Sequence, residues 1–415
     1  MTDTDAPKRI SDGERHDRKY DVVLFGATGF VGRQTVTYFA EHARGLRWAL
    51  AGRNRARLEA LRIVCGEGAR NAGIVVADAD DEAALDALAR DARVVLSTAG
   101  PFALYGSKLV AACVAHRTHY VDITGETPWV RDLIDRHHVQ AAREGTRIIP
   151  GCGFDSVPSD IGTWLVTRAA QDRFGEPCTT VKACFSMRGG LNGGTLASLL
   201  NIIETGKSKA LADPFLLNPE GTRPPPTSLD EDPIAPHRDE LFAAWVGPFV
   251  MGAINTRVVR RSAALLGYGP AFGYQEYLHF GSGVAAALSA ASVSLGAGFA
   301  NIALTFGAAR KLVRAVAPSP GDGPSEATMD GGSFRCELVG ETTSGHILRC
   351  RVTDHGDPGN RATTKMVCES ALALAADRDA LPGGERRGGL LTPASGLGDV
   401  LVKRLRATGM TLVVD

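Results

Sequence analysis

A glycine-rich loop between a short apolar run and a helical segment constrains this chain more than any other feature. Residues 21–25 are DVVLF, a run typical of a buried parallel strand. The loop GATGFVG follows at residues 26–32, and residues 32–43 repeat apolar side chains at helical spacing. Such a turn presents free N–H groups and the positive end of a helix dipole at one point. It predicts a binding site for the phosphates of a dinucleotide.

The alternation of strand and helix continues as far as Pro150. Helical segments separate five further apolar runs, which we expect to be strands at 47–51, 74–78, 94–98, 119–122 and 147–150. Such alternation predicts a parallel sheet with helices on both faces, and right-handed crossovers make it doubly wound. We therefore expect an α/β Rossmann domain over residues 20–150.

The rest of the chain indicates a second domain. A length of 415 residues suggests about two domains. After Pro150 the regular alternation stops, and we expect shorter elements at 179–185, 333–340, 346–354, 363–376, 399–407 and 410–414. We assign 151–384 to a substrate domain, and 385–415 are a candidate to pack back on the first domain. Residues 1–19 are polar and charged, which favours a disordered leader over a signal peptide.

Each glycine of the loop has an expected role. Gly26 permits the tight turn, Gly29 lets the backbone approach the pyrophosphate, and Gly32 allows close contact between helix and sheet. The alternative is an ordinary glycine turn, but the strand–helix pairs that follow favour a binding site. The expected contacts in this loop are Gly26, Ala27, Thr28, Gly29, Phe30, Val31 and Gly32.

The residues after the second expected strand favour NADP(H) over NAD(H). Enzymes that use NAD place an acid there to hold the ribose 2′-hydroxyl, whereas this chain has Arg53, Asn54 and Arg55 and no acid before Glu59. The planar guanidinium of Arg53 can pair with a 2′-phosphate. Alternatively, Arg53 and Arg55 are solvated loop charges.

Two later strand ends are also expected to border the cofactor. Asp78 follows the third strand, where it could face the adenine edge or serve as a helix N-cap. The fourth strand ends in a segment that should line the cofactor crevice, with its last three residues along the nicotinamide ribose. This segment is Ser97, Thr98, Ala99, Gly100 and Pro101.

Several stretches together resemble the saccharopine dehydrogenase-like oxidoreductases. They are DVVLFGATGFVG, LAGRNRARLEAL, STAGPFALYG, YVDITGE and GCGFDSVPSD. Three others resemble one branch more closely, the trans-acting enoyl reductases of mycobacterial complex lipid assembly: GGTLAS, GPFVMGAINTRVVRRSAAL and LTPASGLGDVLVKRLRATGM. The resemblance implies an NADP-binding Rossmann domain joined to an α+β substrate domain with a mixed sheet. It also implies NADPH-dependent reduction of an unsaturated acyl or polyketide intermediate, held on a synthase or carrier.

Enoyl reduction needs a hydride donor near the β carbon and an acid that protonates the α carbon. Tyr105, Asp122 and Asp155 are the candidate catalytic residues because each is expected beside the nicotinamide. Tyr105 could instead be a half-buried aromatic residue whose hydroxyl reaches solvent. Asp122 could cap the turn at Thr124 and Gly125. Asp155 could help to cap the next helix.

Other substrates and roles are open at this stage. One alternative is a dehydrogenase of an amino-acid-like compound, for which several arginines should line the pocket. Another is a non-catalytic, lipid-associated nucleotide-binding protein. Residues 281–308 carry no charge, and their Ala, Ser and Gly content favours a buried or surface-docked helix over a spanning one.

Charge and cysteine content restrict the classes of ligand and partner that we expect for this chain. The chain has 46 basic and 46 acidic residues, so it lacks the basic excess of a nucleic-acid-binding protein. Its eight cysteines form no CxxC pair or zinc-ligand spacing, and no metal site is expected. The expected setting is cytoplasmic, with possible membrane-peripheral contact through 281–308 and a possible homodimer.

Overall fold

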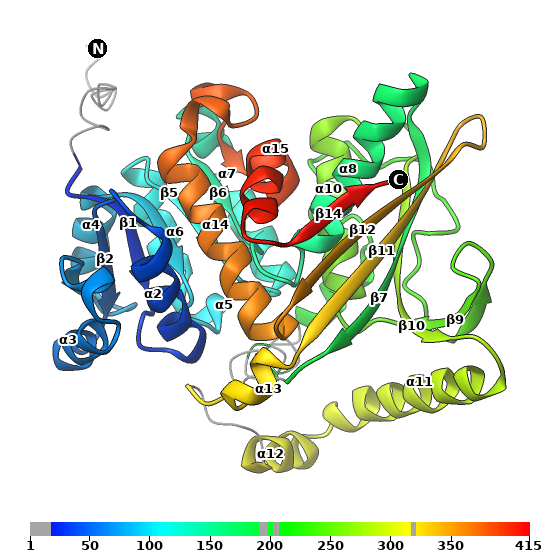
Figure 1. The fold of residues 1–415 in the computed structure, drawn as a ribbon, viewed down its shortest axis with the longest axis horizontal. Helices are drawn as coiled ribbons and strands as arrows, with labels where there is room; N and C mark the ends of the chain where they lie inside the picture. Colours follow the sequence, from blue (N-terminus) through cyan, green and yellow to red (C-terminus); the bar gives the residue numbers. More distant parts are fainter. Residues whose placement is uncertain (1–17, 191–197, 199, 202–203, 205–206, 317–320) are drawn as a thin grey trace, which may run out of the picture.

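The computed structural model describes residues 18–190, 198, 200–201, 204, 207–316 and 321–415. The expected leader lies outside this part of the chain except for its last two residues. The GGTLAS motif also lies outside it, except for Ser198. Within it, two sheets of seven strands each lie side by side (Figure 1). The first, sheet A, is built mainly from the N-terminal half, and the second, sheet B, mainly from the C-terminal half.

Sheet A confirms the doubly wound parallel architecture. All its strand pairs are parallel, and their order is β13-β6-β5-β4-β1-β2-β3. The chain reverses direction across the sheet between β1 and β4, the switch point at which such sheets bind ligands. The strands are β1 (Tyr20–Phe25), β2 (Trp48–Gly52), β3 (Gly73–Val76), β4 (Ala92–Ser97), β5 (His119–Asp122), β6 (Arg147–Ile149) and β13 (Gly389–Leu390).

Both faces of sheet A are buried, which explains its continuous apolar strands. Val22 and Leu24 belong to one core with residues of α2 and α14, whereas Val23 and Phe25 belong to another with residues of α4 and α6. The helices around the sheet are α2 (Phe30–His42), α3 (Arg55–Val64), α4 (Glu82–Asp91), α5 (Phe102–Tyr105), α6 (Ser107–Ala115), α7 (Thr127–Arg143) and α14 (Thr363–Ala376).

Sheet B is mixed, as expected from the resemblance. Its order is β14-β12-β11-β7-β10-β9-β8, in which β7 and β10 are parallel and every other pair is antiparallel. The strands are β7 (Cys178–Arg188), β8 (His237–Asp239), β9 (Ala244–Pro248), β10 (Gly273–Gly281), β11 (Ser333–Thr342), β12 (Ile347–His355) and β14 (Thr411–Val414).

Several helices lie between or beside the two sheets. α8 is Val157–Phe174, and α15 (Pro393–Ala407) starts six residues before the expected position. α15 packs against both α8 and α14. The others are α10 (Gly252–Leu266), α11 (Val284–Leu304), α12 (Gly307–Val316) and α13 (Glu326–Asp330).

The C-terminal segment is shared between the sheets. β13 pairs with β6 in sheet A, and β14 pairs with β12 in sheet B. α14 packs on β1, β4 and β5 although it follows β7 to β12 of sheet B in the chain (Figure 1). A division at residue 150 with a returning C-terminal segment remains our proposal for the domains, and packing would place α14 with the first domain.

The uncharged stretch is a helix, but it is not buried. α11 packs its N-terminal half on β9 and β10, and most of its side chains are exposed. Within the described residues it is the one helix long and apolar enough to cross a membrane. The expectation of a buried segment was therefore wrong, and the surface-docked alternative describes the first half of α11.

Candidate functional site

The glycine loop is shaped for close backbone approach. Gly26 has φ +83°, and a Cβ on it would lie 2.9 Å from the backbone N of Ala99. A Cβ on Gly32 would lie 2.1 Å from the carbonyl oxygen of Gly26. Real Cβ atoms do not approach backbone this closely, so glycine is needed at both positions. The positive φ of Gly26 fits its expected place in a tight turn, whereas Gly32 is required by contact with the loop backbone and not with a strand of the sheet.

The N-terminus of α2 is open to an anion. Gly29 is its N-cap and has no side chain to cap the first-turn N–H groups, and no other side chain among the described residues is seen to accept from them. These donors and the helix dipole fit a pyrophosphate. The Phe30 ring packs directly on Gly323, and Arg33 donates to the carbonyl oxygen of Gly321 at 3.2 Å. The segment that precedes β11 thus lies beside this loop.

Arg53 lies at the end of β2 with its side chain 80% exposed. Its Nε is 3.9 Å from Oδ2 of Asp78, so the two predicted cofactor residues are neighbours. Asn54 is the N-cap of α3 and accepts from the backbone N of Arg57 at 3.1 Å. Asp78 accepts from the backbone N of Asp80 at 3.0 Å, whereas Asp81 is the N-cap of α4. The helix-cap alternative for Asp78 was therefore wrong by three residues.

The segment after β4 lies against the glycine loop. Thr98 donates its backbone N–H to the carbonyl oxygen of Phe25 at 2.9 Å, and its hydroxyl is 3.3 Å from the carbonyl oxygen of Gly26. Ser97 is 1% exposed, and its hydroxyl accepts from the N–H of Ala99. The first part of the predicted 97–101 lining is thus fixed beside the loop at the switch point.

Glu126 is a site residue that the sequence reasoning missed. It is 1% exposed and its carboxylate accepts from the backbone N of Phe102 at 2.7 Å and of Ala103 at 3.1 Å. The hydroxyl of Ser198 donates to the same carboxylate at 2.9 Å. Glu126 therefore caps α5 and ties it to a residue that follows sheet B's β7. The sequence signal that could have identified Glu126 is its place in the YVDITGE stretch, four residues after Asp122.

Asp122 is enclosed rather than open to a substrate. It is 0% exposed, and its Oδ1 accepts from the backbone N of Thr124 at 3.0 Å and of Gly151 at 2.9 Å. Burial raises its pKa to about 7, although the two N–H donors oppose the shift. Asp122 therefore caps the turn at Thr124, as in the alternative considered from the sequence, and it also holds the loop after β6 through Gly151.

Asp155 and Tyr105 are more accessible than Asp122. Asp155 is partly exposed at the entrance to α8, and burial of its carboxyl raises its pKa to about 7. Its neighbour Phe154 packs edge-on against Phe185 and Phe334 of sheet B, so this loop joins the two sheets. Tyr105 is 41% exposed at the last residue of α5, not at the start of a helix.

A small cavity opens at the ends of β5 and β6. Its volume is about 20 Å³, about the space of one water, and most of its lining is apolar. Arg261 is the only charged residue in the lining. It is 2% exposed and donates to the carbonyl oxygens of Leu217 and Leu390. The other lining residues are Thr124, Gly125, Thr127, Val130, Pro150, Gly151, Leu217, Ile254, Val258, Leu391 and Thr392.

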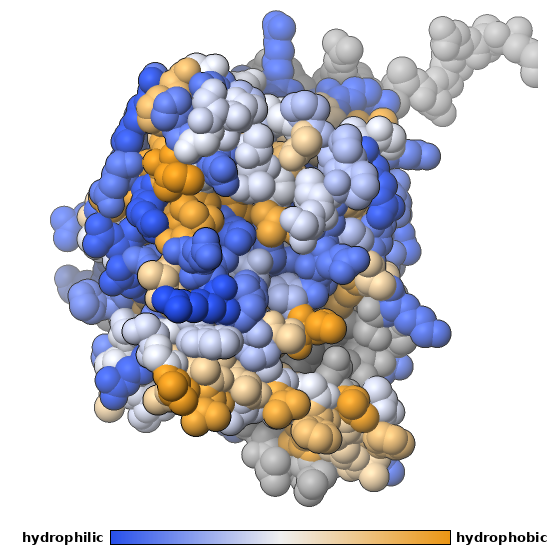
Figure 2. All heavy atoms as spheres, turned by 90° about the vertical axis from the view of Figure 1, so that its right-hand side faces the viewer, coloured by the Kyte–Doolittle hydropathy of each residue, from blue (hydrophilic) through white to orange (hydrophobic). Residues whose placement is uncertain are grey.

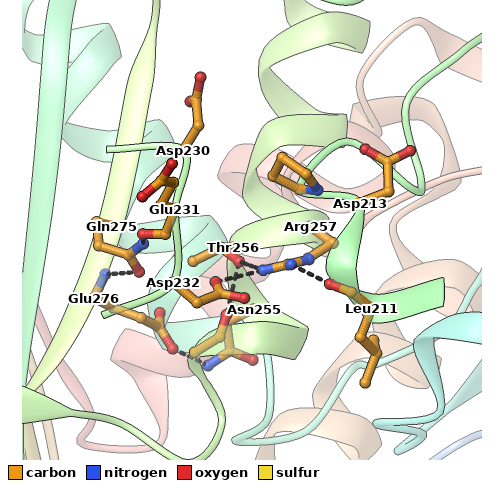
Figure 3. Close-up of polar contacts among 12 residues, drawn as sticks. Leu211, Asp213, Asp230, Glu231, Asp232, Asn255, Thr256, Arg257, Gln275 and Glu276 are labelled. Carbon is orange, nitrogen blue, oxygen red and sulfur yellow. Dashed lines mark hydrogen bonds and ion pairs between the residues drawn. The ribbon is translucent and has the colours of Figure 1, made fainter. Parts of the chain in front are cut away.

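The other arginines of α10 also form hydrogen bonds within the protein. Arg257 is 1% exposed and donates to Asp232 at 2.6 Å and to the carbonyl oxygen of Leu211 (Figure 3). Arg260 donates to four backbone carbonyl oxygens, including that of Tyr274 at 3.0 Å. These residues hold the irregular 211–232 segment on α10.

A buried carboxyl lies beside this network. Glu276 of β10 is 0% exposed and accepts from Asn255 at 2.7 Å, as Figure 3 shows. It also accepts from Ser159 at 2.7 Å and Tyr274 at 2.9 Å. Burial raises its pKa to about 7. The group joins α8, α10 and β10 and has no exposed surface, so its role is structural.

The fold and this site define a two-part oxidoreductase with a dinucleotide site on sheet A. In the described part of the chain, no three His, Cys, Asp or Glu residues are placed to hold a metal ion. The family model of the saccharopine dehydrogenase NADP-binding domain matches residues 22–149. This match covers β1 to β6, the helices between them and the glycine loop. The cofactor is therefore NADP(H).

Relatives along nearly the whole chain identify the family. The trans-acting enoyl reductases of Mycobacterium tuberculosis and Mycobacterium ulcerans are each 39% identical to this chain. The alignments cover 95% of this chain and 98% and 97% of the relatives. A second M. tuberculosis relative is 42% identical over 95% of this chain and 97% of its own length. This chain belongs to the trans-acting enoyl reductase family.

A solved structure supports the fold over the same length. The apo saccharopine dehydrogenase (L-Glu forming) of Saccharomyces cerevisiae has a TM-score of 0.56 and covers 95% of this chain and 99% of its own. Its sequence identity is 15%, so the likeness concerns the fold alone. It agrees with the Rossmann sheet and mixed second sheet described above.

Proposed function

We propose that this chain is an NADPH-dependent enoyl reductase that acts in trans on an unsaturated acyl or polyketide intermediate. The intermediate would be presented as a thioester on a synthase or its carrier domain. The family and the NADP site support a reductase. The observation that carries the choice of substrate is the 39% identity over 95% of this chain to relatives that are named trans-acting enoyl reductases.

The residues of sheet A would hold the cofactor. In our proposal the N–H groups of residues 26–32 bind the pyrophosphate and Arg53 binds the 2′-phosphate. Asp78 would lie at the adenosine end, and residues 97–101 would line the nicotinamide ribose. When bound, NADPH supplies the hydride that reduces the β carbon of the enoyl thioester. Glu126 would keep α5 and Ser198 in place beside this end of the site.

Asp155 is our candidate for the acid that protonates the α carbon. Burial of its carboxyl raises its pKa to about 7, so it can hold a proton at neutral pH, and the residue itself is partly exposed at the start of α8. Asp122 shares the raised pKa but is 0% exposed and accepts two backbone N–H groups. We assign it to holding the turn after β5 against the loop after β6. Tyr105 remains a candidate to orient the thioester from the α5 side.

A genetic experiment tests the substrate class. A strain that lacks this chain should accumulate lipids in which a carbon–carbon double bond is retained, because the synthase product would go unreduced. Reintroduction of the native gene should remove the unsaturated products, and reintroduction of Asp155→Asn should not. An unchanged lipid profile together with a change in amino-acid pools would instead favour a dehydrogenase of an amino-acid-like substrate.

Three finer points belong to this proposal. We propose a cytoplasmic protein that contacts lipid peripherally through residues 281–308, and a homodimer as its assembly. Light scattering of the purified chain tests the homodimer, because a monomer mass would exclude it. A non-catalytic, lipid-associated nucleotide-binding protein is the competing hypothesis, and it predicts NADPH binding without turnover of any enoyl thioester.

A further inference from the structure

The helices α11 and α12 form an arm, residues 284–316, along the outside of sheet B. The first half of α11 is attached to the protein, with Ala286 7% exposed and Ala290 fully buried against β9 and β10. These residues and Ser294 share one side of the helix. Figure 1 shows α11 running along the edge of the molecule towards α12.

The opposite side of α11 carries a continuous apolar stripe. Its six large side chains are spaced by four, seven, four, three and four residues, which places them on one face of a helix. Each is between 62% and 77% exposed, and together they span about 33 Å at 1.5 Å per residue. The stripe consists of Val284, Leu288, Leu295, Phe299 and Ile302 of α11 together with Phe306, which lies two residues after the end of α11. Figure 2 shows apolar surface gathered along this lower edge of the molecule.

α12 continues the arm with a cationic helix. Its sequence contains three basic residues, Arg310, Lys311 and Arg314. Arg310 donates to the carbonyl oxygens of Leu304 and Thr305 at 2.8 Å each and pairs with Glu204 at 3.7 Å, so it also caps α11. Lys311 is exposed. No acidic residue occurs between residues 284 and 316.

We infer that this arm docks the protein onto an anionic lipid bilayer, with α11 lying in the plane of the interface. The stripe would enter the acyl boundary, and the basic residues of α12 would meet negatively charged headgroups. A spanning helix is disfavoured because the side with Ala286 and Ala290 is attached to sheet B.

A protein partner fits the arm less well than a bilayer. Protein interfaces surround an apolar centre with a rim of polar and charged groups of both signs. The stripe is flanked by Ala, Ser and Gly, and the only charges of the arm are cationic. The inference does not depend on the reaction proposed above, because α11 contributes no residue to the cofactor site or to the cavity at the ends of β5 and β6.

Vesicle binding of the full chain tests this inference. The protein should sediment with vesicles of phosphatidylcholine and phosphatidylglycerol more strongly than with phosphatidylcholine alone. Phe299→Ser with Ile302→Ser should weaken binding about tenfold or more, because two exposed apolar anchors are lost. Lys311→Gln should weaken binding to the anionic vesicles by about fivefold. Val139→Ser is the matched control, since Val139 is 78% exposed on α7, outside the arm.

Unchanged NADPH affinity in every variant would show that the site is intact. Failure of the native chain to bind either vesicle would overturn the inference. Equal binding by the native chain and the Phe299→Ser, Ile302→Ser variant would also overturn it. If that variant instead converted a dimer into a monomer while no form bound vesicles, the stripe would be an interface between two copies of this chain.

Discussion

Replacing Arg53 should selectively weaken the binding of NADPH. Arg53→Ala removes the cation that we place on the 2′-phosphate, a group that NADH lacks. A hydrogen bond to a charged group contributes about 1.5–3 kcal/mol when shielded from water. Because the side chain is 80% exposed, we discount this to about 1–2 kcal/mol, or about 5- to 30-fold in Kd. Fluorescence titration of the purified chain with each nucleotide measures both constants.

A second variant should change the same affinity in the opposite direction. The Oδ2 atom of Asp78 lies 3.9 Å from the Nε of Arg53, so its negative charge opposes a 2′-phosphate there. Asp78→Asn should tighten NADPH binding about twofold and leave NADH binding unchanged. Arg55→Ala is the control, because Arg55 pairs with Glu59 at 3.7 Å. Equal losses of NADPH and NADH affinity in Arg53→Ala, or no loss at all, would refute this role of Arg53.

Three further variants test the rest of the site. Gly32→Ala should abolish NADPH binding measured by calorimetry, because its Cβ would lie 2.1 Å from the carbonyl oxygen of Gly26; near-native affinity would show that the loop can move aside. Glu126→Gln should raise KM for NADPH several-fold and lower the melting temperature only slightly. The reason is that one carboxylate oxygen that accepts from α5 becomes a donor. Asp122→Asn should flatten the pH dependence of unfolding: its raised pKa makes stability fall as pH rises from about 4 to about 7, by up to about 4 kcal/mol, and the amide removes that loss. Denaturant unfolding at pH 5 and pH 8 measures this, and an unchanged slope would contradict the assignment.

The sequence predicted the first sheet well because local and tertiary signals agree there. Strands buried on both faces are continuous apolar runs, and each is followed by a helix with its own apolar face. β5 and α14 match their predicted bounds at residues 119–122 and 363–376. β13 was missed because it contains only Gly389 and Leu390, too few residues for a pattern.

The second sheet was harder to predict because its buried positions include polar residues. β10 carries Gln275 and Glu276, both no more than 1% exposed, which hide its alternation. α10 was missed for a similar reason, since Arg257, Arg260 and Arg261 lie on its buried side. Apart from Asp232, which pairs with Arg257, their main partners are backbone carbonyl oxygens of segments distant in sequence, and no local pattern could predict these contacts.

Predictions at the site had the same limits. The positive φ of Gly26 follows from the loop motif, whereas the contact between Glu126 and Ser198 joins residues 72 positions apart. Asp122 and Asp155 were both candidates from the sequence, because Asp122 ends the fifth predicted strand and Asp155 lies in the loop after the sixth. Only their exposure separates them, since Asp122 is fully enclosed and Asp155 is not.

Turnover of an enoyl thioester tests the central claim most directly. The purified chain, NADPH and a carrier-bound 2-enoyl thioester should be mixed, with NADPH followed by its absorbance and the product by mass spectrometry. The account predicts that NADPH is consumed and that the product gains two hydrogens at the double bond. Asp155→Asn should bind NADPH normally and turn over slowly. If NADPH binds but no enoyl thioester is reduced, while an amino-acid-like substrate is turned over with the same cofactor, the proposed function is wrong.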